Sequence, residues 1–78
     1  MTIQAIEHFL GAQPFRPFTL ITSSGKSYRV PHPEFVSFAP SRRVALVFTD
    51  EDAFDALDVR TITEIQHGSP RPKGRRAA

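Results

Sequence analysis

The sequence predicts a small, mainly β domain of the α+β class, in which an N-terminal helix packs on a strongly bent five-stranded antiparallel sheet or small barrel. Three observations predict this class. Residues 43–49 form a continuous run rich in β-branched, aromatic and aliphatic residues, shorter alternating segments flank this run, and an amphipathic segment starts the chain. We expect residues 1–66 to form a single domain and residues 67–78 to form a disordered basic tail.

The first element is predicted to be a helix that begins after Thr2, whose side chain is suited to cap it. The apolar residues that recur at spacings of three and four are Ile3, Ile6, Phe9 and Leu10. Gly11 is well placed to end the helix, and Pro14 follows soon after. A helix of roughly nine residues is marginal alone in water, so we expect it to dock on the sheet.

The next elements are predicted to form a hairpin. Residues 18–23 and 27–30 alternate between apolar and polar side chains, and Gly25 lies in the turn between them, where it supplies a positive φ. The following segment, Pro31, His32 and Pro33, is predicted to be a structural corner, a bulge or an edge, because proline cannot donate to a strand ladder.

Three further strands are predicted at residues 34–39, 43–49 and 53–59, with residues 60–65 as a short helical turn or a last strand. The run at 43–49 is expected to be the central strand. Alternation places Val44, Leu46 and Phe48 on one face and Ala45 and Val47 on the other, so both faces are expected to be covered.

The composition indicates which cellular compartment to expect for the protein and how its charge is distributed. The 78 residues contain no cysteine, which excludes disulfides and thiolate chemistry and favours a reducing compartment. Residues 1–10 contain Glu7 and His8 and resemble neither a secretory leader nor a membrane span, so we expect a cytoplasmic location without membrane contact. The net charge of +2 is uneven, since all charged residues of the tail are basic: Arg71, Lys73, Arg75 and Arg76.

The chain resembles a group of small bacterial proteins of unassigned function that share a Pro-Phe-x-Pro-Phe entry, a glycine hairpin and a Val-Pro-His-Pro-Glu-Phe corner. The matching segments are residues 14–18, 24–28 and 30–35, within a resemblance that spans roughly residues 13–65. The resemblance implies no activity and no site. One departure is Arg42, where a turn glycine is expected before the central strand.

The order of one helix and five strands is similar to that of bacterial Sm-like RNA-binding barrels of the Hfq kind, and Gly25 fits the first glycine of their pattern. The similarity implies a small barrel and, as an expectation, RNA binding. The chain departs from that pattern at residues 29–31, where those barrels keep another glycine, and it lacks their closing Tyr-Lys-His segment.

The leading functional hypothesis is a noncatalytic interaction module that forms a homo-oligomer or binds a protein through a strand edge, with weak phosphate affinity from the tail. The alternative is an Sm-like RNA- or DNA-binding protein. Its predicted nucleic-acid contacts are Lys26, Arg29, Arg42 and Arg43, together with Arg71, Lys73, Arg75 and Arg76 of the tail. Tyr28 or Phe35 would have to provide any stacking on bases.

No catalytic residue, cofactor, metal or small-molecule substrate is predicted. His32 and Glu34, with His8 or His67, could form a metal site. We favour the alternative role for His32, in which its ring donates a hydrogen bond to a backbone carbonyl at the corner. The Gly-Lys-Ser at residues 25–27 lacks the first glycine and the strand-to-helix context of a phosphate loop. The acids between residues 50 and 58 lack the glycine and terminal glutamate of a calcium loop. We therefore expect these acids to form a solvated face, to which a cationic partner or the tail could bind.

Overall fold

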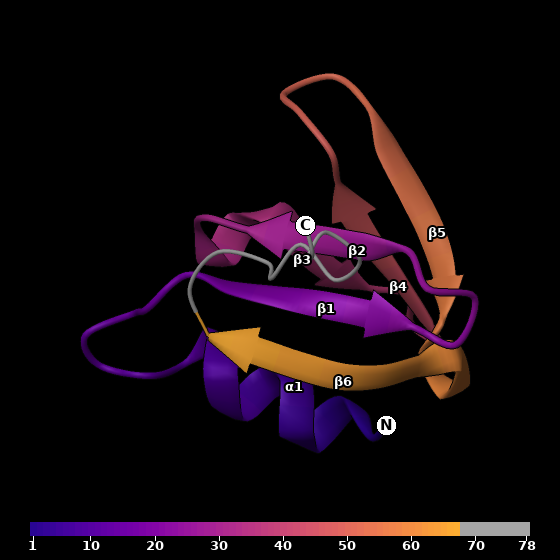
Figure 1. Ribbon diagram of the computed structural model, residues 1–78, viewed down its shortest axis with the longest axis horizontal. Helices are drawn as coiled ribbons and strands as arrows, with labels where there is room; N and C mark the ends of the chain where they lie inside the picture. The colour runs from indigo at the N-terminus through magenta and orange to yellow at the C-terminus, as the bar shows by residue number, and fades with distance from the viewer. Residues whose placement is uncertain (68–78) are drawn as a thin grey trace, which may run out of the picture.

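The computed structural model describes residues 1–67, so the predicted basic tail from residue 68 onward lies outside the described residues. One helix and six strands form a mostly β fold of two three-stranded antiparallel sheets (Figure 1). The elements are α1 (Ile3–Leu10), β1 (Phe18–Thr22), β2 (Ser27–Val30), β3 (Val36–Phe38), β4 (Val44–Phe48), β5 (Phe54–Asp58) and β6 (Ile62–His67), with 3-10 turns η1 (Pro33–Phe35) and η2 (Val59–Thr61).

Helix α1 begins and ends where the sequence predicts. The Thr2 hydroxyl accepts a hydrogen bond from the Ala5 amide at 3.2 Å, and the Gly11 amide donates to the Glu7 carbonyl at 2.9 Å. The helix lies against the sheet that contains β1 and β6 (Figure 1). The Phe9 ring contacts the Phe18 ring there, with centroids 5.7 Å apart.

The first sheet has the strand order β2-β1-β6, and the predicted hairpin between β1 and β2 is confirmed. Gly25 has a φ of 91° in its turn, a conformation that side-chain-bearing residues rarely adopt. Thr19 and Leu20, which point to opposite faces of β1, are both fully buried. The strand enclosed on both faces is therefore β1 and not the run at residues 43–49.

The second sheet has the order β3-β4-β5, so β4 is the centre of its own sheet. Ala45 and Val47 are fully buried on the inner face, whereas Val44, Leu46 and Phe48 are only half-buried. The prediction that both faces of this run are covered is therefore wrong for the outer face.

The predicted single five-stranded sheet or barrel is corrected to two sheets of three strands, which form no closed barrel over residues 1–67. Two short turns separate the sheets. Pro33 opens η1, where the Phe35 amide donates to the His32 carbonyl at 3.1 Å, so β3 begins at Val36 and not at residue 34. The η2 turn likewise separates β5 from β6, and β6 continues to His67, one residue beyond the predicted end of the domain.

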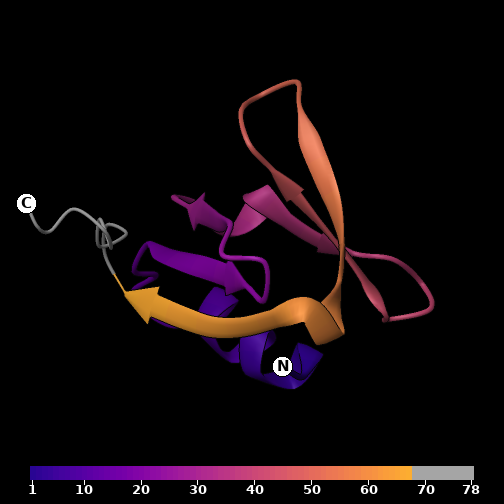
Figure 2. The ribbon, with the colours of Figure 1, turned by 45° about the vertical axis from the view of Figure 1, so that its right-hand side comes forward.

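A single core fills the space between α1 and the inner faces of the two sheets. The buried apolar residues are Ile3, Ile6, Phe18, Leu20, Tyr28, Val30, Val36, Ala45, Val47, Val59 and Ile62. The β4–β5 hairpin projects beyond this core (Figure 2). None of the helices in the described part of the chain combines the length and the apolar character needed to cross a membrane.

Candidate functional site

The outer face of the second sheet carries a group of apolar side chains. Antiparallel pairing places Leu46 opposite Ala56 and Phe48 opposite Phe54, so these side chains share a face with Val44. Phe54 is 53% exposed, and its ring contacts that of Phe48 at a centroid distance of 5.5 Å. We call these five residues the open face.

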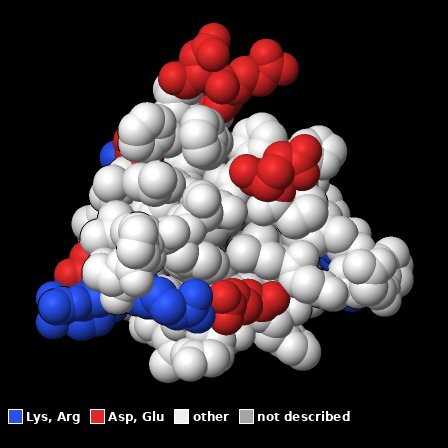
Figure 3. All heavy atoms as spheres, turned by 180° about the vertical axis from the view of Figure 1, so that it is seen from behind, with Lys and Arg blue, Asp and Glu red and all other residues white. Residues whose placement is uncertain are grey.

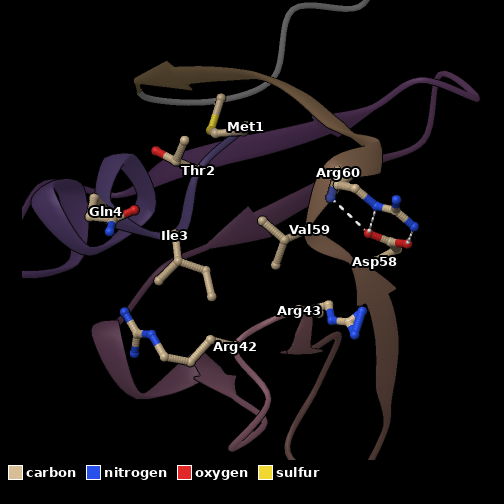
Figure 4. Close-up of a pocket in the computed structure, with 9 residues that line it drawn as sticks. All are labelled: Met1, Thr2, Ile3, Gln4, Arg42, Arg43, Asp58, Val59 and Arg60. Atoms are coloured by element: carbon tan, nitrogen blue, oxygen red, sulfur yellow. Dashed lines mark hydrogen bonds and ion pairs between the residues drawn. The ribbon is translucent and has the colours of Figure 1, made fainter.

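Three arginines form a basic end beside the first residue of β4: Arg42, Arg43 and Arg60. Together with α1 they surround a cavity of about 270 Å³ whose apolar floor is made by Ile3 and Val59 (Figure 4). Arg42 and Arg43 point to opposite sides of this cavity, so their guanidinium groups do not converge on one ligand position.

Two of these arginines are held by carboxylates. Arg42 Nη2 lies 3.2 and 3.1 Å from the two carboxylate oxygens of Glu7. Arg60 makes two side-chain hydrogen bonds to Asp58, from Nε at 3.2 Å and from Nη2 at 2.9 Å. In residues 1–67, Arg43 forms no ion pair at contact distance.

The Asp58 carboxylate is strongly stabilised in its charged form. Hydrogen bonds from the Arg60 side chain and the Arg60 amide, followed by the charges of Arg60 and Arg43, lower the pKa of Asp58 to about 2. The same hydrogen bond and the negative charge of Asp58 raise the pKa of Arg60. The basic end therefore keeps its charge over the whole physiological range.

Four carboxylates form an acidic end at the other end of β4: Glu34, Asp50, Glu51 and Asp52. Asp50 Oδ1 accepts hydrogen bonds from the amides of Asp52 at 2.8 Å and Ala53 at 2.9 Å, which fixes the turn between β4 and β5. Glu34 and Glu51 line a cavity of about 220 Å³ with the rings of Phe35 and Phe48. Within the described range, no salt bridge involves any of these four acids.

Basic and acidic side chains are thus concentrated at opposite ends of β4. Figure 3 shows acidic side chains gathered at the top, at the tip of the projecting hairpin, and basic side chains gathered at the lower left edge, with acidic side chains directly beside them. Largely uncharged surface lies between the two groups. Since β4 (Val44–Phe48) follows Arg43 and is followed by the acidic turn that begins at Asp50, the open face lies between a basic end and an acidic end.

A further polar cluster joins the two sheets. The Tyr28 hydroxyl on β2 donates to Asp55 Oδ2 on β5 at 2.7 Å, and Lys26 Nζ lies 3.7 Å from the same oxygen. Burial, followed by the hydrogen bond to Asp55, raises the pKa of Tyr28. A hydrogen bond with Tyr28 and the charges of Tyr28 and Asp55 raise the pKa of Lys26. The hydrogen bond between Tyr28 and Asp55 therefore connects the two sheets, and Lys26 lies at contact distance from the same carboxylate.

The remaining predicted residues lie in different places. Arg29 is exposed on β2, on the face opposite to Tyr28. The predicted contacts Arg71, Lys73, Arg75 and Arg76 lie outside the described residues. The predicted contacts within residues 1–67 thus fall into two groups, one on the β1–β2 hairpin and one before β4.

The predicted corner of Pro31, His32 and Pro33 is where the chain leaves β2 and enters η1. The His32 side chain is exposed and its ring lies 5.9 Å from the Phe35 ring. The expected hydrogen bond from this ring to a backbone carbonyl is not formed within residues 1–67; the corner is instead held by the hydrogen bond from the Phe35 amide to the His32 carbonyl. No group of three histidine, aspartate or glutamate side chains converges in this part of the chain.

Sequence reasoning missed Arg60, Phe54 and Ala56 as members of this surface. Pairing residues 53–59 with the central strand in antiparallel register would have placed Phe54 opposite Phe48. Alternation alone does not choose this register, because it shows which side chains share a face and not which residues of two strands pair.

Comparisons of the chain with family models, with curated proteins and with solved structures give no match.

Proposed function

We propose that the protein is a noncatalytic interaction module that binds a protein surface through the open face of the second sheet. The observation that carries this proposal is the group of apolar side chains on the outer face of β4 and β5, with Phe54 53% exposed. Contiguous apolar surface with a charged rim is typical of a protein-binding site. The basic and acidic ends supply such a rim and favour the approach of an oppositely charged partner surface.

The face is a better candidate than the strand edges that the sequence suggested. The outer edge of the second sheet is β5, which carries Asp55 and Asp58, and charged side chains on an edge oppose pairing with a further strand. The other edge, β3, has three residues and lies between η1 and Pro40. The open face, in contrast, offers two aromatic rings and three aliphatic side chains.

A paramagnetic cosolute tests the proposal without knowledge of the partner. In a dilute solution of the full chain, an apolar nitroxide should broaden the NMR signals of Leu46 and Ala56 more than that of the exposed Thr63 on β6. Binding of a hydrophobic fluorescent dye should fall in Leu46→Glu and persist in Ile21→Glu, which changes a half-buried residue of the other sheet. Equal broadening at all three sites, or a loss of dye binding only in the control, would refute the proposal.

Nucleic-acid binding is the second candidate, and the observation that favours it is the grouping of Arg42, Arg43 and Arg60 at one end of the molecule. The basic tail would add contacts to phosphate without reading sequence. Tyr28 does not support the stacking role considered for it, because it is 7% exposed and its hydroxyl binds Asp55.

Binding of a labelled oligonucleotide at two salt concentrations tests this candidate. Arg43→Gln should reduce the slope of log K against log salt by about 1 if Arg43 contacts phosphate. An unchanged slope, with all affinity lost when the four tail cations are replaced, would assign the binding to the tail and remove the domain as a reader of nucleic acid.

A further inference from the structure

We propose that the partner of the open face is a second copy of this chain, docked face to face with the two β4 strands antiparallel. The inference rests on the proposed function of the open face and adds the identity and orientation of the partner. What points to a second copy is the distribution of charge along β4, which is complementary to itself after a two-fold rotation.

Charged groups flank Leu46 on both sides along β4. Arg43 lies three residues before Leu46, and the acidic turn begins at Asp50, four residues after it. At a rise of about 3.3 Å per residue, these residues lie about 10 and 13 Å from the centre of the strand. A rotation that exchanges the two ends of β4 therefore brings basic side chains over acidic ones.

Two stacked sheets can be related by a two-fold axis in only two simple ways. If the axis lies between the sheets and runs along β4, Arg43 faces Arg43 of the second copy and the acidic end faces the acidic end, and both contacts are repulsive. If the axis is perpendicular to β4, the strands are antiparallel and each basic end faces an acidic end. The charges select the second arrangement.

The groups needed for these contacts are available. Within the described residues Arg43 has no ion pair of its own, and the carboxylates of Glu34 and Glu51 have no cation. The cavity of about 220 Å³ between these carboxylates and the rings of Phe35 and Phe48 is suited to an arginine side chain, because a guanidinium group can stack on an aromatic ring while it pairs with a carboxylate. The two-fold symmetry forms this contact twice.

The centre of the same arrangement is apolar. Leu46 faces Leu46 of the second copy, Val44 faces Phe48, and Ala56 faces Ala56. Phe54, the partner of Phe48 in the sheet, faces Asp58, the partner of Val44, at the rim of this apolar centre. Sheets that stack in this way lie about 10 Å apart with interdigitated side chains. The half-buried residues of the open face would then complete a second, smaller core.

Charge reversal of the full chain tests both the partner and the orientation. The first variant is Arg43→Glu, the second combines Glu34→Lys with Glu51→Lys, and the control is Arg16→Glu, an exposed cation away from the open face. Sedimentation equilibrium measures the dimer dissociation constant of each. We expect the native chain and the control to dimerise equally, and each of the first two variants to dimerise about tenfold more weakly, because each replaced contact occurs twice.

Mixing the two variants gives the decisive result. In the mixed dimer, one half of the interface pairs the glutamate introduced at position 43 with the introduced lysines, and the other half keeps the native charges, so affinity should return to that of the native chain. A mixture as weak as its components refutes the antiparallel arrangement. A native chain that stays monomeric at millimolar concentration refutes the second copy as partner; if the nitroxide still broadens Leu46 and Ala56, the proposed function survives that result.

Discussion

The turn before β4 provides the sharpest test of the local structure. Arg42 has a φ of 62°, the one positive φ of a non-glycine residue among residues 1–67. The left-handed conformation costs an L-residue roughly 1–2 kcal/mol. The sequence pattern independently suggests a glycine at this position, so we compare Arg42→Gly with Arg42→Ala.

Three contributions set the expected free energies of unfolding. Both substitutions remove the ion pair between Arg42 and Glu7, at a cost of about 0.2–1 kcal/mol, because the two side chains are 52% and 44% exposed, respectively. Only glycine relieves the backbone strain of roughly 1–2 kcal/mol. Glycine also gives the unfolded chain more freedom, which costs about 0.4–1 kcal/mol relative to alanine. The glycine variant should therefore be more stable than the alanine variant by roughly 0.5–1 kcal/mol.

Thermal unfolding at low protein concentration measures this difference, which corresponds to a Tm higher by about 3–6 °C for glycine. The neighbouring Arg43 supplies the matched control, because its φ is not positive. At position 43, alanine should be more stable than glycine. If alanine equals or exceeds glycine at position 42 as well, the left-handed turn does not exist in solution and the reasoning fails.

Three further predictions follow from the described contacts. Gly25→Ala should lower the free energy of unfolding by about 1–2 kcal/mol in urea titrations, since φ is 91° there, whereas Gly11→Ala, at a φ of −93°, should cost less than half as much. Tyr28→Phe should cost about 1.5 kcal/mol in the same assay through loss of the hydrogen bond that joins the two sheets, and an unchanged midpoint would contradict that role. The pKa of Asp58, followed by NMR, should be about 2 and should rise toward 3.8 in Arg60→Gln. Because the pKa is lower in the folded than in the unfolded state, the stability that this ion pair contributes is present above about pH 4 and is lost as the pH falls toward 2. A pKa near 3.8 in the native chain would refute the ion pair.

The local elements follow from the sequence alone. The spacing of Ile3 and Ile6, the cap at Thr2 and the stop at Gly11 define α1, because a short helix depends on its own termini and one apolar stripe. Alternation and Gly25 define the first hairpin in the same way. The glycine expected at position 42 predicted a special turn, and the structure shows the backbone conformation that glycine would adopt most easily.

Which apolar surfaces are covered depends on the tertiary structure. Residues 44–48 are apolar on both sides, and their composition does not show that the helix lies on the other sheet and leaves Leu46 and Phe48 half-buried. The approach of Arg60 to Arg42 and Arg43 likewise depends on where η2 returns the chain. Local propensity acts over a few neighbouring residues, whereas burial and charge clusters arise from contacts between distant segments, so the candidate site became visible only when the two sheets were in place.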